Sequence, residues 1–382
     1  MAVMEIPLAR PALGPREEQA VLEVMRSGNL AQGPRVREFE EKFAEITGAE
    51  YAIATSSGTA AIHLALLAHG IGSGDDVITS PLTFIATANA IVQSGARPVF
   101  VDVDDTLTMD PRAAEAAIGP HTRAIMPVHL HGNPAAVDEL KRICDRHGLV
   151  LLQDACQAHG ALVASRPLGY YSTALYSFYA TKNITTGEGG MVTTNDPEVA
   201  ARCASLRHQG YSPYGPAYAH DVVGYNYRMS EMSAAIGICQ LDQLVTVTAA
   251  RRANARRYDA GLAPTFDRPR IRPGHLHVYH QYVVRMRSQT ERDRVSSLLH
   301  EAGIGAAVHY PIPVHHQAPY WNGTGNRNGS GHRNGYRNGH TKGLVLEQAE
   351  RAAADMLSIP VHPGLTPRQV DRIVATLNAI VA

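Results

Sequence analysis

The chain has few cysteines, no excess of charge and no long apolar run, and each absence excludes a class of protein. Four cysteines are scattered without a Cys-x-x-Cys pair along 382 residues: Cys144, Cys156, Cys203 and Cys239. This spacing argues against a disulfide framework, so we expect reduced thiols in a cytoplasmic protein. Basic and acidic residues number 35 each, which favours neither nucleic acid nor a membrane as a partner. No apolar run reaches membrane-spanning length, and the first 16 residues lack the apolar core of a signal peptide.

What is present indicates a globular enzyme of two domains. Hydrophobic residues make up 45% of the chain and charged residues 18%, enough for a sizeable core. Short apolar runs alternate with helical stretches, which predicts a mostly parallel, doubly wound α/β sheet. The expected strands are 51–54, 76–79, 98–102, 124–128, 149–152 and 175–178, and the expected helices are 59–68, 85–93 and 135–147.

We assign residues 1–245 to this large domain and residues 246–382 to a smaller α+β C-terminal domain. A helix over 240–262 is expected to leave the first domain, followed by a strand at 277–285 and helices at 291–302 and 367–380. Within the second domain, residues 321–343 contain Arg-Asn-Gly three times amid further Gly, Asn and His. Such a segment has little apolar area to bury, so we expect a mobile insertion.

One lysine stands out because of its surroundings. Lys182 lies in Ser177-Phe-Tyr-Ala-Thr-Lys-Asn-Ile-Thr-Thr-Gly-Glu-Gly-Gly190, a polar loop whose glycines permit close backbone approach to a ligand. Its amine could form a Schiff base with a carbonyl cofactor, if burial or a nearby cation lowers its pKa from the usual value of about 10.4. Taken alone, a lysine in a loop is more often a solvated charge.

Two upstream segments could supply the other contacts of pyridoxal phosphate. Asp154 ends an apolar strand, and its carboxylate could pair with a protonated pyridine nitrogen or simply cap the following turn. Ser56-Ser-Gly-Thr59 opens an apolar helix and could bind a phosphate or only cap the helix. Ligands of parallel sheets bind beyond the carboxyl ends of the strands, so we expect Ser57, Asp154 and Lys182 to lie near one another.

Three further side chains could complete such a site. Gln157 could donate to the phenolic oxygen of the cofactor, and Ser177 could give one more hydroxyl to the phosphate. Phe84 could stack on the pyridine face, although an ordinary core aromatic would look the same in the sequence.

Ordered motifs along nearly the whole chain resemble the DegT/DnrJ/EryC1/StrS family of sugar aminotransferases, within fold type I of the pyridoxal phosphate enzymes. They are 57–65, 153–160, 177–190, 224–229, 309–315 and 357–364. The resemblance implies that Lys182 binds the cofactor and moves protons, and that Asp154 pairs with the ring nitrogen. It further implies the other cofactor contacts: Gly58, Thr59 and Ser177 at the phosphate, Gln157 at the phenolic oxygen and Phe84 on the ring.

The resemblance also implies a homodimer with shared active sites. Asn226, in Gly224-Tyr-Asn-Tyr-Arg228, would then reach the phosphate of the other subunit. Arg228 would help to bind substrate or donor anions. His309 and Tyr310 would border the sugar pocket, unless they serve only in core packing.

The expected reaction is transfer of an amino group from L-glutamate to a ketone of a nucleotide-linked keto-deoxysugar. Residues 185–190 resemble the 4-aminotransferases, which favours C4. The alternatives are a keto-cyclitol or amino-shikimate-type ring as substrate, or a non-catalytic sensor or scaffold. Lys182 argues against the dehydratases of the family, which have a histidine there. No metal is expected, because His129-x-His131 and His315-His316 lack suitable spacing or a nearby carboxylate set.

Overall fold

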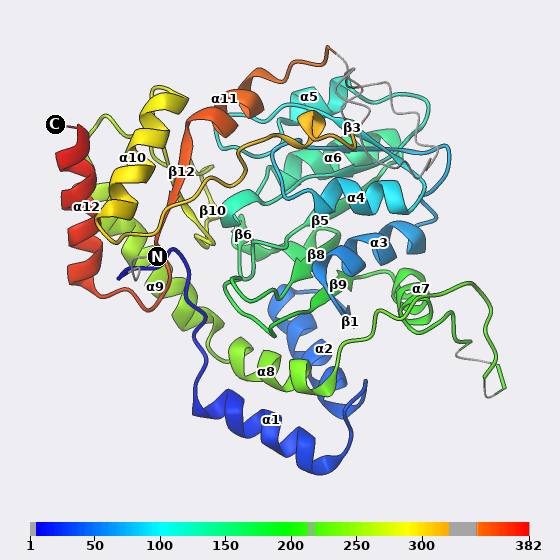
Figure 1. Cartoon of the computed structure of the whole chain (residues 1–382). Coiled ribbons are helices and arrows are strands. Elements are labelled where there is room, and N and C mark those ends of the chain that lie inside the picture. Colours follow the sequence, from blue (N-terminus) through cyan, green and yellow to red (C-terminus); the bar gives the residue numbers. More distant parts are fainter. Residues whose placement is uncertain (1–4, 213–214, 217, 321–340, 342, 382) are drawn as a thin grey trace, which may run out of the picture.

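The computed structural model describes residues 5–212, 215–216, 218–320, 341 and 343–381. Apart from Thr341 and Gly343, the predicted insertion at 321–343 lies outside the described residues. Figure 1 shows a large sheet with helices on both sides, and a smaller group of helices at the C-terminal end of the chain.

A seven-stranded sheet in the order β1-β9-β8-β5-β4-β2-β3 forms the centre of the larger part. Its strands are β1 (Tyr51–Thr55), β2 (Asp76–Thr79), β3 (Arg97–Phe100), β4 (Thr122–Met126), β5 (Val150–Asp154), β8 (Thr173–Ser177) and β9 (Gly190–Thr194). Neighbours from β8 to β3 pair in parallel, whereas β9 runs antiparallel to both β1 and β8. The predicted mostly parallel sheet is therefore confirmed.

Successive residues of each central strand belong to two different cores, because side chains alternate across a sheet. In β2, for example, Val77 packs in one core and Ile78 in the other. Both faces are thus buried, which explains why these strands read as continuous apolar runs. The helices of this part are α2 (Pro34–Thr47), α3 (Gly58–Ala68), α4 (Ala86–Gln93), α5 (Pro111–Ala116), α6 (Val137–His147) and α7 (Pro197–Arg207).

The C-terminal part has its own core around a two-stranded antiparallel sheet. Its elements are α9 (Leu244–Gly261), β11 (Tyr282–Arg285), α10 (Gln289–Glu301), α11 (Glu347–Asp355), β12 (Met356–Ile359) and α12 (Pro367–Val381). Ile6, near the N-terminus, also packs in this core. Short strands β6 (Leu162–Val163), β7 (Arg166–Pro167) and β10 (His275–Leu276) form a third sheet. We retain residue 245 as a proposed domain boundary, since α9 begins beside it.

Two expected elements differ in the structure. The helix predicted over 240–262 is present as α9 but begins four residues later, because α8 (Glu231–Leu241) ends before it and the two helices meet at an angle of 59°. Around the break, Gln240 donates to Glu17 and Asp242 pairs with Arg16, so polar contacts hold the end of α8 against α1 (Pro15–Ser27). The strand predicted from residue 277 begins only at Tyr282, after an irregular segment.

Among the described residues, no single helix has the length and apolar character needed to cross a bilayer; only the bent pair α8 and α9 meets that test, when taken together.

Candidate active site

A cavity of about 510 Å³ lies at the carboxyl edge of the central sheet. Ser57 follows β1, Asp154 ends β5 and Lys182 follows β8, and all three line this cavity as predicted. The cavity also includes most of the other predicted site residues: Gly58, Thr59, Phe84, Gln157, Ser177, His309 and Tyr310. Their side chains come from segments that are far apart in the sequence, and the direction of the strands brings them together.

The loop that carries Lys182 is closed at both ends and hydrogen-bonded throughout. Ser177 at the end of β8 pairs with Gly190 at the start of β9. Inside the loop, the amide of Thr186 donates to the carbonyl of Phe178 at 3.0 Å, and the Thr185 hydroxyl donates to the same oxygen at 3.0 Å. The threonines therefore hold the loop, while the lysine side chain faces the cavity.

The surroundings of Lys182 favour an unprotonated amine. Burial lowers the pKa of its ammonium group below the usual value, and the acidic groups of Cys156 and Asp154 oppose the shift. No carboxylate of the described residues lies within 4 Å of its nitrogen. A buried amine of this kind is a nucleophile at a lower pH than free lysine.

Asp154 is a buried carboxylate without a basic partner among the described side chains. Its Oδ2 accepts a hydrogen bond from the Thr87 hydroxyl at 2.7 Å, and Oδ1 accepts from the amide of Cys156 at 3.1 Å. Thr83 in turn lies 2.8 Å from Thr87, hydroxyl to hydroxyl. These bonds orient the carboxylate toward the cavity but do not neutralise it. A cationic ligand atom, such as a protonated pyridine nitrogen, would do so.

The N-terminus of α3 forms one end of the cavity. The Ser57 hydroxyl caps the helix by accepting from the amide of Ala60 at 3.1 Å. The preceding amides, of Gly58 and Thr59, have no acceptor within the described part of the chain. Gly58 is required here, because a β-carbon would lie 2.6 Å from that of Ser177. Free amides at a helix N-terminus are a suitable phosphate site.

Aromatic and amide groups border the space between these two ends. The ring of Phe84 is 55% exposed and lies 5.8 Å from that of Tyr310, so one face is open for stacking. The Gln157 side chain accepts from the amide of His131 at 2.7 Å and donates to the Tyr310 hydroxyl at 3.2 Å. Gln157 is therefore held between the two parts of the chain and lines the cavity.

The opposite wall comes from the irregular segment 277–281, which the sequence did not identify as part of the site. His280 and Gln281 line the cavity, and Tyr279 before them has a left-handed φ of 48°. The buried guanidinium of Arg251 donates to the carbonyls of Tyr279 at 3.0 Å and His280 at 3.2 Å. Arg251 thus holds an unfavourable backbone conformation in place. Burial lowers its pKa to about 10.

The histidines near Lys182 are held neutral. Burial lowers the pKa of His309 to about 4 and that of His159 to about 3. The Nδ1 atom of His309 lies 3.0 Å from the Ser358 hydroxyl, which leaves the other ring nitrogen for the cavity. A neutral imidazole there can give or take a hydrogen bond from a sugar hydroxyl.

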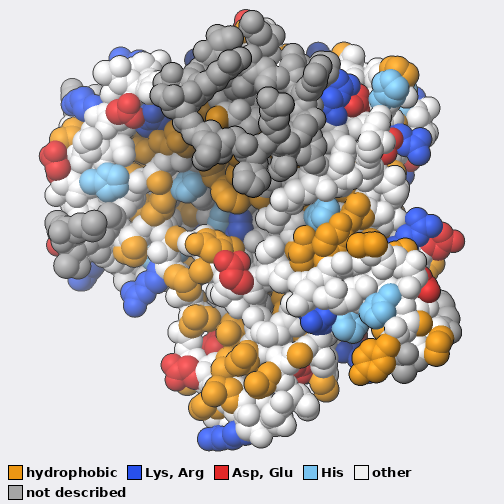
Figure 2. Space-filling model, turned by 45° about the vertical axis from the view of Figure 1, so that its right-hand side comes forward, with side chains coloured by type: hydrophobic (Ala, Val, Ile, Leu, Met, Phe, Trp, Pro, Cys, Tyr) orange, Lys and Arg blue, Asp and Glu red, His pale blue; other side chains and the backbone are white. Residues whose placement is uncertain are grey.

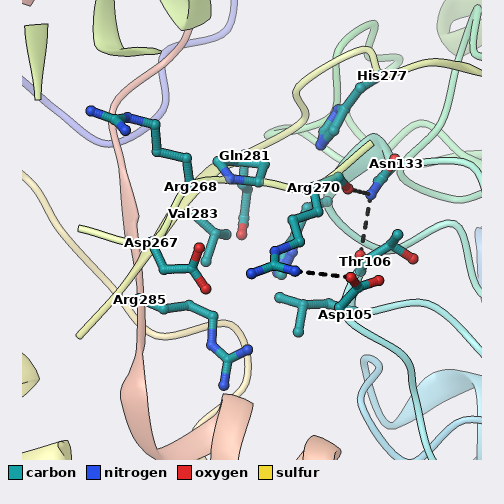
Figure 3. A pocket seen from close by; sticks show the side chains of 13 residues that line it. Asp105, Thr106, Asn133, Asp267, Arg268, Arg270, His277, Gln281, Val283 and Arg285 are labelled. Atoms are coloured by element: carbon teal, nitrogen blue, oxygen red, sulfur yellow. Dashed lines mark hydrogen bonds and ion pairs between the residues drawn. The ribbon is translucent and has the colours of Figure 1, made fainter. Parts of the chain in front are cut away.

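A second, much smaller cavity of about 20 Å³ lies behind Gln281 (Figure 3). Figure 3 shows that side chains of both parts of the chain enter it. Arg270 pairs with Asp105 at 3.1 Å, and the Asn133 amide donates to the carbonyls of Thr106 and Arg270. Its volume suits one water molecule at most. These contacts fasten the segment that leads to the active-site wall.

Two predicted residues lie away from this cavity. Asn226 is exposed and forms an isolated bridge with His208, and an Arg228 nitrogen lies 2.8 Å from the ring of His208. Neither lines the cavity of its own chain. Their expected roles at the site of another subunit therefore remain a prediction.

The residues present fit pyridoxal phosphate. A neutral-tending lysine, a buried carboxylate that needs a cation, free helix amides and an open aromatic face meet in one cavity of sufficient size. With the mostly parallel sheet, they are the features expected of a pyridoxal phosphate-dependent enzyme of fold type I.

Comparisons with known proteins agree with this class. The chain matches the model of the DegT/DnrJ/EryC1/StrS aminotransferase family over residues 11–378. It is 39% identical over 369 residues to a pleiotropic regulatory protein of Geobacillus stearothermophilus, a match that covers 95% of this chain and 93% of that protein. The chain belongs to the DegT/DnrJ/EryC1/StrS aminotransferase family.

Two solved structures show how similar the fold is. DesV of S. venezuelae, described in complex with a ketimine intermediate, is 37% identical with a TM-score of 0.86 and covers 95% of this chain and 93% of its own. DesI, described in the presence of its TDP-sugar product, is 31% identical with a TM-score of 0.86 and covers 98% of this chain and 93% of its own.

Proposed function

We propose that this protein transfers the amino group of L-glutamate to the C4 ketone of a nucleotide-linked keto-deoxysugar, with pyridoxal phosphate as cofactor. The convergence of Lys182, Asp154 and the N-terminus of α3 in one cavity is the observation that carries the proposal. The nucleotide sugar is supported by DesI, whose structure is described with a TDP-sugar product.

The cofactor, when bound, supplies an electron sink for the carbon next to the transferred nitrogen. Lys182 would bind the cofactor through Nζ and carry protons to and from that carbon. Asp154, oriented by Thr87, would keep a proton on the pyridine nitrogen. Gly58 and Thr59 would hold the phosphate. Each role uses a group that already faces the cavity.

The substrate would occupy the space beside His309, Tyr310 and Gln281, opposite the α3 end of the cavity. These neutral side chains suit the hydroxyl groups of a sugar, because each offers a hydrogen-bond donor or acceptor. A cavity of about 510 Å³ can hold a cofactor ring and a sugar together.

We further propose a homodimer in which each site is completed by the other subunit. Lys182 is the one Lys or Arg among the described residues that line the cavity, too little cationic charge for a phosphate and a glutamate. Asn226 and Arg228 lie outside it, available to a second copy. Hydrophobic side chains gather on the part of the surface where α1 lies (Figure 2). On α1 itself, Leu22 and Met25 are exposed. Such a surface suits a protein partner.

A keto-cyclitol or amino-shikimate-type ring remains the alternative substrate, and a sensor or scaffold the alternative role. No contact in the cavity favours either over the sugar. The retained lysine and carboxylate favour an enzyme, although the Geobacillus relative is described as regulatory. All four cysteines are free, which fits the cytoplasmic location included in this proposal.

The reaction can be tested in its two halves. Purified protein loaded with pyridoxal phosphate should be yellow, and L-glutamate should bleach it with release of 2-oxoglutarate. A panel of 4-keto and 3-keto nucleotide sugars and a keto-cyclitol should then restore the colour, fastest with a 4-keto sugar. Lys182→Ala should abolish turnover with the fold intact. A glutamate-insensitive protein would refute the aminotransferase, and recovery only by the cyclitol would refute the sugar.

The shared site is tested by mixing two inactive variants. Lys182→Ala and Asn226→Ala chains, allowed to exchange subunits, should recover part of the activity, because one of the two sites in a mixed dimer is then intact. Recovery should be absent when exchange is prevented by cross-linking. No recovery despite proven exchange would mean that each site is built from one chain.

A further inference from the structure

A group of metal-ligating side chains lies outside the active-site cavity. The short helix η3 (Val314–His316) carries His315 and His316, and Glu350 comes from the first turn of α11. Their ligand atoms all lie within 4.8 Å of one another. The sequence argument against a metal here was the lack of suitable spacing and of a nearby carboxylate set. Folding supplies one, because Glu350 follows His315 by 35 residues in the chain.

The distances within this group suit a bound ion. Oε1 of Glu350 lies 3.1 Å from Nε2 of His315 and 3.5 Å from Nε2 of His316. Zinc at its usual distance of about 2.0–2.1 Å from each ligand, with tetrahedral angles, places its ligand atoms about 3.4 Å apart. The two observed distances between ligand atoms, 3.1 Å and 3.5 Å, lie on either side of that value.

One oxygen of Glu350 lies close to both histidines. Oε1 of Glu350 also accepts from the amide of Leu346 at 3.0 Å. Together with His315 this provides two donors for one carboxylate oxygen. The 3.5 Å distance to His316 exceeds the usual range of hydrogen bonds, about 2.7–3.2 Å. A cation bound between the three side chains would contact both rings and this oxygen at once.

One side of this group is buried in the protein, and the other side is partly exposed to solvent. His315 is buried, with its ring 6.3 Å from that of Phe100, whereas His316 and Glu350 have side chains about one-third exposed, at 33% and 30%. The first turn of α11 is held by Asp102, which accepts from the amides of Gln348 and Ala349. An ion can therefore enter from solvent and meet ligands that are already in place.

We propose that His315, His316 and Glu350 bind a divalent transition-metal ion, with Zn²⁺ as the ion to be tested and water as its fourth ligand. Two imidazoles and one carboxylate are a ligand set that zinc accepts. The ion joins η3 to α11. The amide of Val314, also in η3, donates to the carbonyl of Pro81 at 2.8 Å. By fixing η3, the ion would also stabilise the loop that leads to Phe84. The role is structural, since none of the three ligands lines the active-site cavity.

Zinc binding to the full-length, untagged protein tests this proposal. After dialysis against a chelator, the wild type should take up Zn²⁺ in calorimetric titration, and its unfolding temperature should rise with Zn²⁺ concentration. His316→Asn and Glu350→Gln should each weaken the affinity at least about tenfold and remove the thermal effect. Glu350→Gln retains an acceptor for the amide of Leu346, so the variant should fold.

A matched control comes from an exposed pair that has the same chemistry but no second histidine beside it. Nε2 of His147 lies 3.4 Å from Oε1 of Glu115, and the changes His147→Asn and Glu115→Gln should leave zinc affinity as in the wild type. The proposal is overturned if the wild type takes up no Zn²⁺ in the titration and its unfolding temperature does not respond to Zn²⁺. It is equally overturned if His316→Asn and Glu350→Gln bind as tightly as the control variants, since the ion would then lie elsewhere, for example at His332 or His340.

Discussion

Gly190 connects the central sheet to the N-terminus of α3, where we propose that the phosphate binds, and its replacement by alanine gives a quantitative prediction. At the start of β9 it pairs with Thr55 of β1 and Ser177 of β8. A β-carbon there would clash with the carbonyl oxygen and carbon of Ser57 and lie 2.6 Å from Oγ1 of Thr55. Distances below 3.0 Å are essentially never seen for a real β-carbon, and the main obstacle is backbone. The N-terminus of α3 must therefore move.

Overpacking of this kind costs about 1–3 kcal/mol, and alanine regains about 0.4–1 kcal/mol by restricting the unfolded chain. We expect Gly190→Ala to lose about 1 kcal/mol, or about 2–4 °C in the unfolding midpoint. Movement of Ser57 should also weaken pyridoxal phosphate binding at least about tenfold, measured by fluorescence titration. Gly119→Ala is the control, because its β-carbon meets nothing within 4 Å. Equal stability and cofactor affinity in the two variants would refute the reasoning.

Three further predictions concern the walls of the cavity. Thr87→Val removes the hydroxyl that donates to Asp154 at 2.7 Å. Because a hydrogen bond to a charged group contributes about 1.5–3 kcal/mol, the dissociation constant of pyridoxal phosphate should rise at least about tenfold. An unchanged dissociation constant in a fluorescence titration would contradict this. Burial lowers the pKa of Lys182, so the rate at which the protein binds pyridoxal phosphate should stay high well below about pH 10.4, the pKa of free lysine. The rate should fall only as the pH drops through the lowered pKa of Lys182. A rate that falls in parallel with that of free lysine would show an exposed amine. Arg251→Met leaves the carbonyls of 279–280 without their guanidinium donor, so KM for the keto substrate should rise several-fold while cofactor affinity is unchanged. The control Arg257→Met removes an exposed ion pair and should change neither quantity. Equal KM values in the two variants would mean that Arg251 does not position this wall.

The sequence predicted those parts of the site that follow directly from strand order. Asp154 and Lys182 each stand just after an apolar run, and the direction of parallel strands is enough to place them at one edge. Thr87 was not foreseen, because its bond to Asp154 depends on where the first turn of α4 lies relative to the end of β5. No local pattern marks such a contact between residues 67 positions apart.

Contacts between the two parts of the chain were the least predictable. Residues 277–281 read as strand because they alternate and contain aromatics, yet Tyr279 has a left-handed φ of 48° that Arg251 holds from another helix. Similarly, the 59° bend between α8 and α9 occurs without proline or glycine at residues 242–243. In each case a tertiary contact outweighs the local preference of the chain.

The antiparallel direction of β9 has a consequence for how strongly a ligand can bind. Because β9 starts where β8 ends, the 12 residues from 178 to 189 leave and return at the same edge of the sheet. Their ordering is achieved during folding, by strand pairing and threonine bonds, and not during ligand binding. A bound cofactor therefore loses little of its interaction energy to arranging the loop, which is the meaning of preorganisation. Lengthening this hairpin should thus lower cofactor affinity even where no contacting residue is changed.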